Sequence, residues 1–382
     1  MLNLARTQVM GAYIPDANAS EVTAAVAKKQ EQKTIDPCPD LEYVEVTTRD
    51  ELVAAAGDLS EDGYAKIRLA ADIIYNSYNC LKVTAGTIVL DLNGHKLHGS
   101  DTVVHSYGEG TVIIINDLKG GGEIKGTDIN NNYGVLQVKD GGHMVLNTGL
   151  ITTSLEVKDV MFGVVAITEG SFQMNGGEII TNASAINTTN ADIRIKGGYL
   201  RSNRTCVVYS DGDQAVQIYG NAHLDGGIVT KMGRTYICGD AILENTGYIL
   251  GGKPYDEFDN LGTYCTYDES SGVGPTTIRS AIMAVSGLFG SEYYTGEDGN
   301  NDMSIVIEGN AKVSTSLGAP VIELLMPNTE YNQKVDMKLK RETYKLYDHD
   351  TLDTIYKEEE PDKSLKLEAF TTDLTVNGGI EK

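Results

Sequence analysis

One short pattern of apolar and polar residues recurs along the chain between Leu81 and about Leu325. In each copy a few apolar residues alternate with polar ones, an Asn or Gly turn follows, and a second apolar pair closes the unit. Copies stand at residues 86–97, 171–179, 192–200 and 215–220. This alternation predicts short β-strands with one buried face, and the Asn and Gly residues predict sharp corners between them.

The spacing of the copies predicts a coil with three short strands in each turn. The first apolar residues of the aligned copies are Ile88, Val112, Met144, Phe172, Ile193, Val216, Ile242 and Ile305, at intervals of 24, 32, 28, 21, 23, 26 and 63 residues. Three strands of ~4 to 5 residues and three corners fill an interval in the twenties, and a corner can lengthen without disturbing the stack. In the interval of 63 we predict at least one further turn, with residues 278–287 as a candidate strand.

The residue types suit such a coil. Val, Ile, Leu and Thr fit a pleated surface, and inward side chains of stacked turns form one continuous apolar column. Gly-Gly pairs recur at 121–122, 141–142, 176–177, 197–198, 226–227 and 251–252. We interpret these pairs as corners, because a phosphate-binding loop would require a following helix with Lys and Ser or Thr.

The segment before the first repeat predicts an entry of strand, helix and strand. Residues 41–46 alternate as a strand, residues 48–51 form a capping box that opens a short helix, and residues 64–69 return as a strand. A helix here would cover the open end of the apolar column, as the ends of solenoids require.

This entry and the phrase that follows it carry a family resemblance. Together with Thr-Ile-Val-Leu-Asp-Leu-Asn-Gly-His-Lys-Leu at residues 87–97, the entry resembles the opening of right-handed parallel β-helix proteins of the pectate-lyase-like group. Similar phrases occur in phage fibre and tailspike proteins and in adhesin-like surface proteins. The resemblance covers residues 41 to about 325 and implies an all-β, right-handed parallel β-helix. It does not imply an activity, because the matching positions are corner and core residues.

We divide the chain into three parts. Residues 1–40 are expected to form an N-terminal anchoring arm with a hinge, residues 41–326 the β-helix with its capping helix, and residues 327–382 a small antiparallel β unit. The arm residues expected to contact a partner are Tyr13, Ile14, Pro15, Val22, Val26, Pro37 and Pro39. An arm of this kind can attach a rod to an assembly, because the arm loses its conformational entropy only when it binds.

Composition narrows the range of partners. The formal net charge of -23 disfavours nucleic acid and anionic membranes, and no apolar run is long enough to cross a bilayer. The start of the sequence lacks the apolar region and cleavage site of a secretory signal peptide. Five cysteines without a CxxC pair indicate buried thiols without disulfides, made in a reducing compartment.

Candidate chemistry is sparse, and we predict no catalytic, cofactor or metal site. Most acidic residues of the repeat stand beside Gly or Asn and are expected to cap corners, as at Asp91, Asp117, Asp140, Asp192, Asp211, Asp213 and Asp240. His95, His98 and His105 lack an acidic ligand at a matched spacing, so we interpret them as surface or corner residues. Five tyrosines could form a recognition surface or an interface between copies: Tyr255, Tyr264, Tyr267, Tyr293 and Tyr294.

These observations lead to a hypothesis of function that depends on the resemblance. We expect a non-enzymatic structural protein of a phage or phage-like particle, a head fibre, decoration protein or spike, assembled in the host cytoplasm into the virion. Its arm would bind capsid or other virion proteins. The rod would form a homo-oligomer, for example a trimer, and its surface could attach to host polysaccharide. Two alternatives stay open, a polysaccharide-degrading tailspike and a bacterial surface adhesin.

Overall fold

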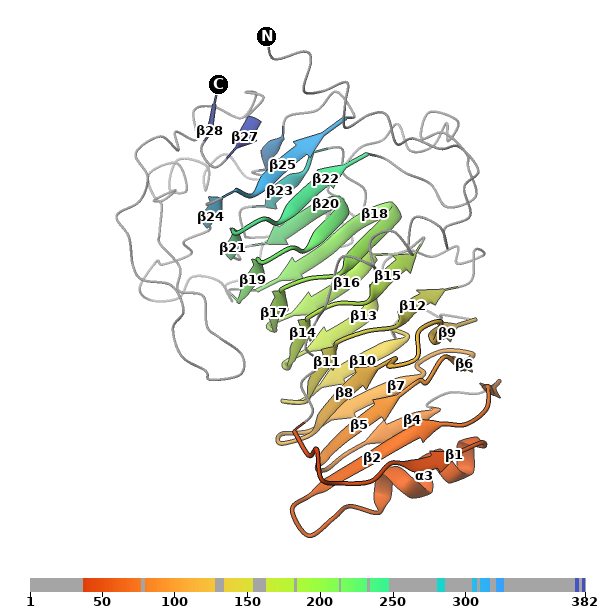
Figure 1. The fold of residues 1–382 in the computed structure, drawn as a ribbon. Helices are drawn as coiled ribbons and strands as arrows, with labels where there is room; N and C mark the ends of the chain where they lie inside the picture. The colour runs from red at the N-terminus through yellow and green to blue at the C-terminus, as the bar shows by residue number, and fades with distance from the viewer. Residues whose placement is uncertain are drawn as a thin grey trace.

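The chain forms a parallel β-solenoid, in which strands stack in chain order along one axis (Figure 1). The computed structural model describes residues 37–76, 80–127, 134–153, 163–181, 184–212, 214–231, 234–246, 280–285, 304–307, 310–316, 321–325, 375–377 and 380–381. Helix is limited to one short segment in this part of the chain. The predicted all-β parallel solenoid is therefore confirmed.

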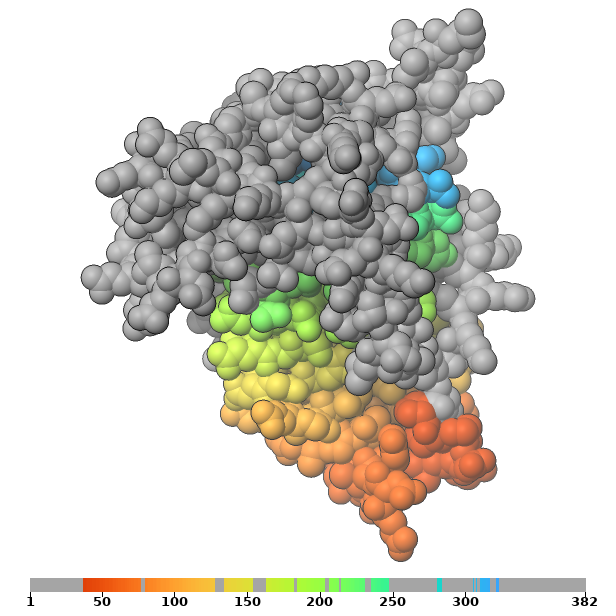
Figure 2. All heavy atoms as spheres, turned by 90° about the vertical axis from the view of Figure 1, so that its left-hand side faces the viewer, coloured from red at the N-terminus to blue at the C-terminus, as the bar shows by residue number. Residues whose placement is uncertain are grey.

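Sheet A contains ten strands and forms one side of the solenoid. In stacking order these are β1 (Val44–Val46), β2 (Tyr64–Leu69), β5 (Thr87–Asp91), β8 (Val112–Asn116), β11 (His143–Leu146), β14 (Ser171–Met174), β17 (Asp192–Ile195), β19 (Ala215–Ile218), β21 (Arg234–Ile237) and β24 (Ser304–Ile307). Figure 2 views the molecule from the side on which β14, β17 and β19 lie in Figure 1, and the turns again follow one another in chain order.

The second sheet has 18 strands and supplies the other two sides, which we call ladder B and ladder C. Ladder B stacks β3 (Ile73–Tyr75), β6 (Lys96–Gly99), β9 (Glu123–Gly126), β12 (Leu150–Thr153), β15 (Glu178–Thr181), the first parts of β18 (Tyr199–Asp211) and β20 (His223–Lys231), β22 (Ile242–Asn245) and β25 (Lys312–Thr315). Ladder C stacks β4 (Leu81–Val83), β7 (Val104–Tyr107), β10 (Leu136–Lys139), β13 (Gly163–Thr168), β16 (Ser184–Thr189), the last parts of β18 and β20, β23 (Ile282–Val285) and β26 (Ile322–Leu325).

Each turn visits sheet A, ladder B and ladder C in that order, as β5, β6 and β7 do before β8 begins the next turn. The register corrects three details of the predicted alignment. Ile88 pairs with Ile113, one residue beyond the predicted Val112. Ile242 belongs to ladder B, and the sheet A partner of Val216 is Thr235.

The prediction of an additional turn in the interval of 63 residues is wrong. Strand β21 pairs directly with β24, with Thr235 opposite Ile305, so no further sheet A strand separates them. The candidate segment at 278–287 contributes β23, which is the ladder C strand of the same turn. The long interval therefore reflects the lengths of the connections between the strands of one turn, which the stack tolerates.

The interior is one apolar column built from alternate side chains of all three sides. Ile88 and Leu90 of β5 point inward and are 0% exposed, as are their register partners Ile113 and Ile115 of β8. Removing a side chain of this size from water contributes about 1.5–3 kcal/mol, which offsets part of the entropy lost on ordering the chain.

Corners are held by polar side chains and glycines. The Asp117 carboxylate accepts hydrogen bonds from the backbone N–H groups of Gly94 and Gly122, each at 2.7 Å, which confirms its predicted role as a corner cap. Beside it, Asn147 donates to Asn116 at 2.9 Å, and Asn175 donates to Asn147 at 2.8 Å, so three turns share a buried amide ladder. One glycine of each described Gly-Gly pair has a positive φ, namely Gly121, Gly141, Gly177, Gly198 and Gly226.

Helix α3 (Arg49–Gly57) forms where the capping box predicts it. Thr48 accepts a hydrogen bond from the backbone N–H of Glu51, and the Glu51 carboxylate accepts one from the backbone N–H of Thr48. The apolar side of the helix joins the column through Leu52, and the helix contacts β1 to β4 at the N-terminal end of the stack (Figure 1).

The predicted end units fall mostly outside the described residues. Residues 1–36 and the alternating segments at 334–340, 343–346 and 365–367 are not among them. Two short strands, β27 (Thr375–Asn377) and β28 (Ile380–Glu381), pair in antiparallel fashion and follow β25. Within the described ranges, no helix has the length and apolar character needed to cross a membrane.

Candidate functional site

The outward surface of ladder B carries the densest set of paired charges that we find in the described part of the chain. Its inward side chains belong to the apolar column, so the intervening residues point outward. The register aligns them in two rows: Lys96, Glu123, Leu150, Glu178, Tyr199, His223, Ile242 and Lys312, and beside them His98, Lys125, Thr152, Ile180, Arg201, Asp225, Glu244 and Ser314.

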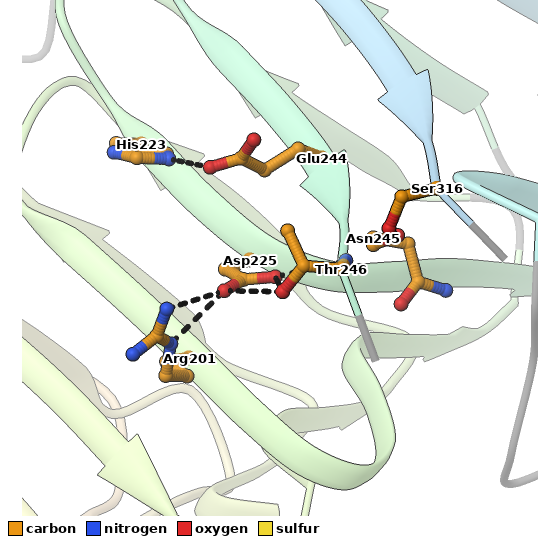
Figure 3. Close-up of polar contacts among 7 residues, drawn as sticks. All are labelled: Arg201, His223, Asp225, Glu244, Asn245, Thr246 and Ser316. Carbon is orange, nitrogen blue, oxygen red and sulfur yellow. Dashed lines mark hydrogen bonds and ion pairs between the residues drawn. The ribbon is translucent and has the colours of Figure 1, made fainter. Parts of the chain in front are cut away.

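An ion pair between Arg201 and Asp225 forms the centre of this surface (Figure 3). Arg201 donates to one carboxylate oxygen of Asp225 from two nitrogens, at 3.0 and 2.7 Å. The backbone N–H and the hydroxyl of Thr246 donate to the other oxygen at 3.1 and 2.8 Å. Asp225 is 1% exposed, so a guanidinium and a threonine from neighbouring turns compensate a buried charge.

Directly beside this pair, His223 of β20 and Glu244 of β22 form a hydrogen bond between adjacent turns (Figure 3). The distance from His223 Nε2 to the Glu244 carboxylate is 2.6 Å, and the His223 ring meets the ring of Tyr199 edge-on at 5.0 Å. The hydrogen bond from His223 lowers the pKa of Glu244 below its ordinary value of 4.5, despite the opposing effect of burial. Glu244 is therefore an ionised carboxylate at neutral pH.

The same bond recurs nearer the N-terminal end of ladder B. His98 Nε2 lies 3.0 Å from the Glu123 carboxylate, and this hydrogen bond lowers the pKa of Glu123. His95 Nδ1 lies 3.3 Å from Asp72 of the preceding turn. His95, His98 and His223 thus each link two turns of the solenoid. His105, in contrast, is buried in β7 and is not the surface or corner residue that the sequence predicted.

Two carboxylates of this surface are neighbours, as the catalytic pair of a glycosidase is. Asp225 and Glu244 are register partners on adjacent strands, which places two carboxylates side by side. A glycosidase general acid needs a raised pKa so that it carries a proton near neutral pH. Glu244 has the opposite shift, so it does not match a general acid, and Asp225 accepts hydrogen bonds from Arg201 and Thr246.

Neither a metal-ligand cluster nor a thiolate nucleophile is found among the described residues. Across these ranges no group of three His, Cys, Asp or Glu side chains is placed to hold a metal ion. Burial raises the pKa of Cys80 to about 11 and that of Cys206 to about 12, so neither is a thiolate at neutral pH. Cys80, Cys206 and Cys238 are buried as predicted, whereas Cys38 is only partly buried, and no disulfide links the cysteines described here.

Most of the residues predicted to contact partners lie outside the described residues: Tyr13, Ile14, Pro15, Val22, Val26, Tyr255, Tyr264, Tyr267, Tyr293 and Tyr294. Pro37 and Pro39 are exposed, and between them begins a turn in which the backbone N–H of Leu41 donates to the carbonyl of Cys38 at 3.1 Å. Arg194 and Asp192, two residues apart on β17, form an ion pair at 3.9 Å.

Arg201, His223, Asp225 and Glu244 were not singled out by the sequence analysis. Alternation along each strand places them outward, but only the register between turns shows that they meet. No protein-family model matches this chain, and neither a curated protein nor a solved structure is similar enough to match it.

Proposed function

We propose that this protein is a non-enzymatic, rod-like structural protein of a phage or phage-like particle, such as a head fibre, decoration protein or spike. The observation that carries the non-enzymatic part is the pairing of carboxylates on ladder B. Glu123, Asp225 and Glu244 each bond a cationic or histidine side chain of a neighbouring turn. These bonds tie turns together, which suits a rod that bears load or displays a surface.

The virion part of the proposal rests on the resemblance of the repeat phrase to phage fibre and tailspike proteins. In this proposal the coil is right-handed, the hand that connections between parallel strands almost always take. Helix α3 closes its N-terminal end, and the arm attaches the rod to capsid or other virion proteins. Rods of this kind would associate as homo-oligomers and could bind host glycans along their outer faces.

A direct test of the virion role is to produce particles that carry a tagged copy of the full chain and to image them by electron microscopy. We expect labelled rods at the particle surface. Particles that form normally without the tagged chain, together with free rods in the supernatant, would contradict the proposal.

A polysaccharide-degrading enzyme is the second candidate, because Asp225 and Glu244 are neighbouring carboxylates beside Arg201. The test is to incubate the purified full chain with capsular and cell-wall polysaccharides and to count the reducing ends released. We expect no release above that of a heat-denatured sample. Release that is abolished in Asp225→Asn and Glu244→Gln would replace the structural proposal with the enzymatic one.

A further inference from the structure

A single row of side chains runs along the outside of sheet A, in unbroken register from β2 to β21. We call it the outer row, and its members are Lys66, Val89, Ile114, Val145, Gln173, Arg194, Gln217 and Tyr236. Their chain neighbours on either side, such as Ile88 and Leu90, enter the apolar column. The outer row therefore points away from the interior of the solenoid.

Although it points outward, the outer row is buried at every position except Arg194, which is partly exposed. Val89, Ile114 and Val145 are 0%, 7% and 5% exposed and form an apolar cluster separate from the main column. Further along, Gln173 is 1% exposed and Tyr236 is 0% exposed. An outer face with this burial over successive turns is a covered face and not a solvated one.

The beginning of the cover is visible in the described residues. Cys38 packs against the cluster of Val89, Ile114 and Val145. Lys66 donates to the carbonyl of Cys38 at 3.3 Å, and its ammonium lies 4.5 Å from the centre of the Tyr43 ring. The chain just before β1 thus crosses the outside of sheet A at the N-terminal end of the outer row.

The outer row also contains buried acceptors that need donors. The side-chain oxygens of Gln173 and Gln217 are buried and accept no hydrogen bond. Leaving such a group unpaired costs about 1–3 kcal/mol, so buried amides are rarely left in this condition. An extended peptide laid along the row would bring backbone N–H groups to both oxygens.

We propose that the outer row is the docking groove for the N-terminal segment of this same chain, residues 1–36, which continues from Cys38 along the outside of sheet A. The row from Val89 to Tyr236 covers six strand spacings, or about 29 Å. An extended chain covers this distance with about nine residues, and 36 residues precede Pro37. The segment carries apolar side chains for the cluster, among them Ile14, Val22 and Val26.

With or without a virion role, the arm occupies its own sheet A when the protein is free, whatever partner it meets later. A partner that binds the arm must then draw it off the outer row, and the exposed row would become a second contact surface.

The first test is hydrogen exchange with mass spectrometry on the full chain and two matched variants. Ile114→Lys places a charge in the outer row, whereas Leu118→Lys places the same charge four residues later at a position that is 51% exposed. We expect protected amides within residues 1–36 of the wild type, and exchange at least ten-fold faster there in Ile114→Lys but not in Leu118→Lys. Amides of β9 and β12 report in each variant that the stack itself is intact.

A second test does not depend on disrupting the groove. A thiol-to-amine cross-linker is applied to full-length Gln173→Cys, with Thr152→Cys on ladder B as the control, and linked peptides are identified by mass spectrometry. We expect links from residue 173, but not from residue 152, to Lys28, Lys29 or Lys33. The proposal is overturned if residues 1–36 exchange as an unstructured chain, or if Ile114→Lys removes protection from residues 247–303 instead of residues 1–36. It is also overturned if cross-links form only between isotopically distinct copies of the chain.

Discussion

At the residue scale, the carboxylate of Asp225 is a buried charge whose partners come from neighbouring turns. In the wild type, Nη2 of Arg201 lies 2.7 Å from a carboxylate oxygen of Asp225. Asp225→Asn keeps the shape of the side chain but leaves the Arg201 guanidinium without this counter-charge. We expect a loss of about 2–3 kcal/mol in the free energy of unfolding, measured by urea denaturation. The control Asp50→Asn changes a side chain that is 93% exposed and should cost less than about 1 kcal/mol.

His105 of β7 is a second residue with a measurable consequence. It is 6% exposed, and neither ring nitrogen has a hydrogen-bond partner. Burial, with a smaller contribution from the charges of Lys82 and Lys139, lowers the pKa of His105 from 6.5 to about 4. The folded protein therefore keeps this ring neutral at a pH where the unfolded chain takes up a proton.

This shift predicts acid sensitivity with a definite sign. Above pH 6.5 both states are neutral at this position, and between pH 6.5 and 4 only the unfolded state gains the proton, so stability falls. The effect should approach about 3 kcal/mol near pH 4. Urea unfolding of wild type and His105→Gln at pH 7 and pH 4.5 measures it, and we expect the wild type to lose more stability than the variant. Parallel losses would contradict this account.

At the scale of elements, the corner between β14 and β15 depends on the backbone of Gly177. Its φ is 77°, and a Cβ atom there would lie 2.7 Å from the carbonyl oxygen of Gly149 in the turn below. Gly177→Ala should therefore cost at least about 1–2 kcal/mol in the free energy of unfolding. Gly57→Ala, where an added Cβ meets nothing within 4 Å, is the matched control and should leave that free energy nearly unchanged. Equal stability of the two variants would argue against a close contact between these corners.

The sequence predicted helix α3 more accurately than it predicted the alignment of the strands. Helix α3 was predicted from Thr48 and Glu51 because a capping box is a local signal, complete within four residues. The strand alignment was less secure, because Val112 and Ile113 are both apolar and a shift of one residue exchanges the two faces of β8. In the structure Ile113 enters the apolar column, whereas Val112 packs against the cluster of the outer row.

At the scale of the whole molecule, each turn contacts mainly the turns above and below it. A cavity should then weaken the stack locally, because stability in such arrays is a sum of nearest-neighbour terms. Phe172→Ala removes a side chain that is 1% exposed and should cost about 3–5 kcal/mol. By hydrogen exchange, amides in β11, β14 and β17 should open faster, while those of β2 stay unchanged. Leu118→Ala should leave all of them unchanged, and uniform acceleration in Phe172→Ala would indicate global cooperativity instead.

The sequence by itself determined the class of this fold: alternation with a period of two, Gly and Asn corners, and spacings in the twenties together require short strands stacked in three-sided turns. These signals are local, so they can be read without knowing which turns touch. The tertiary structure alone decided which residues meet across turns, as Arg201 does Asp225 and His223 does Glu244, 24 and 21 residues apart. Connections of variable length separate the turns, so no fixed spacing encodes these contacts. For the same reason, only the register between turns brings the residues of the outer row into one continuous line on sheet A.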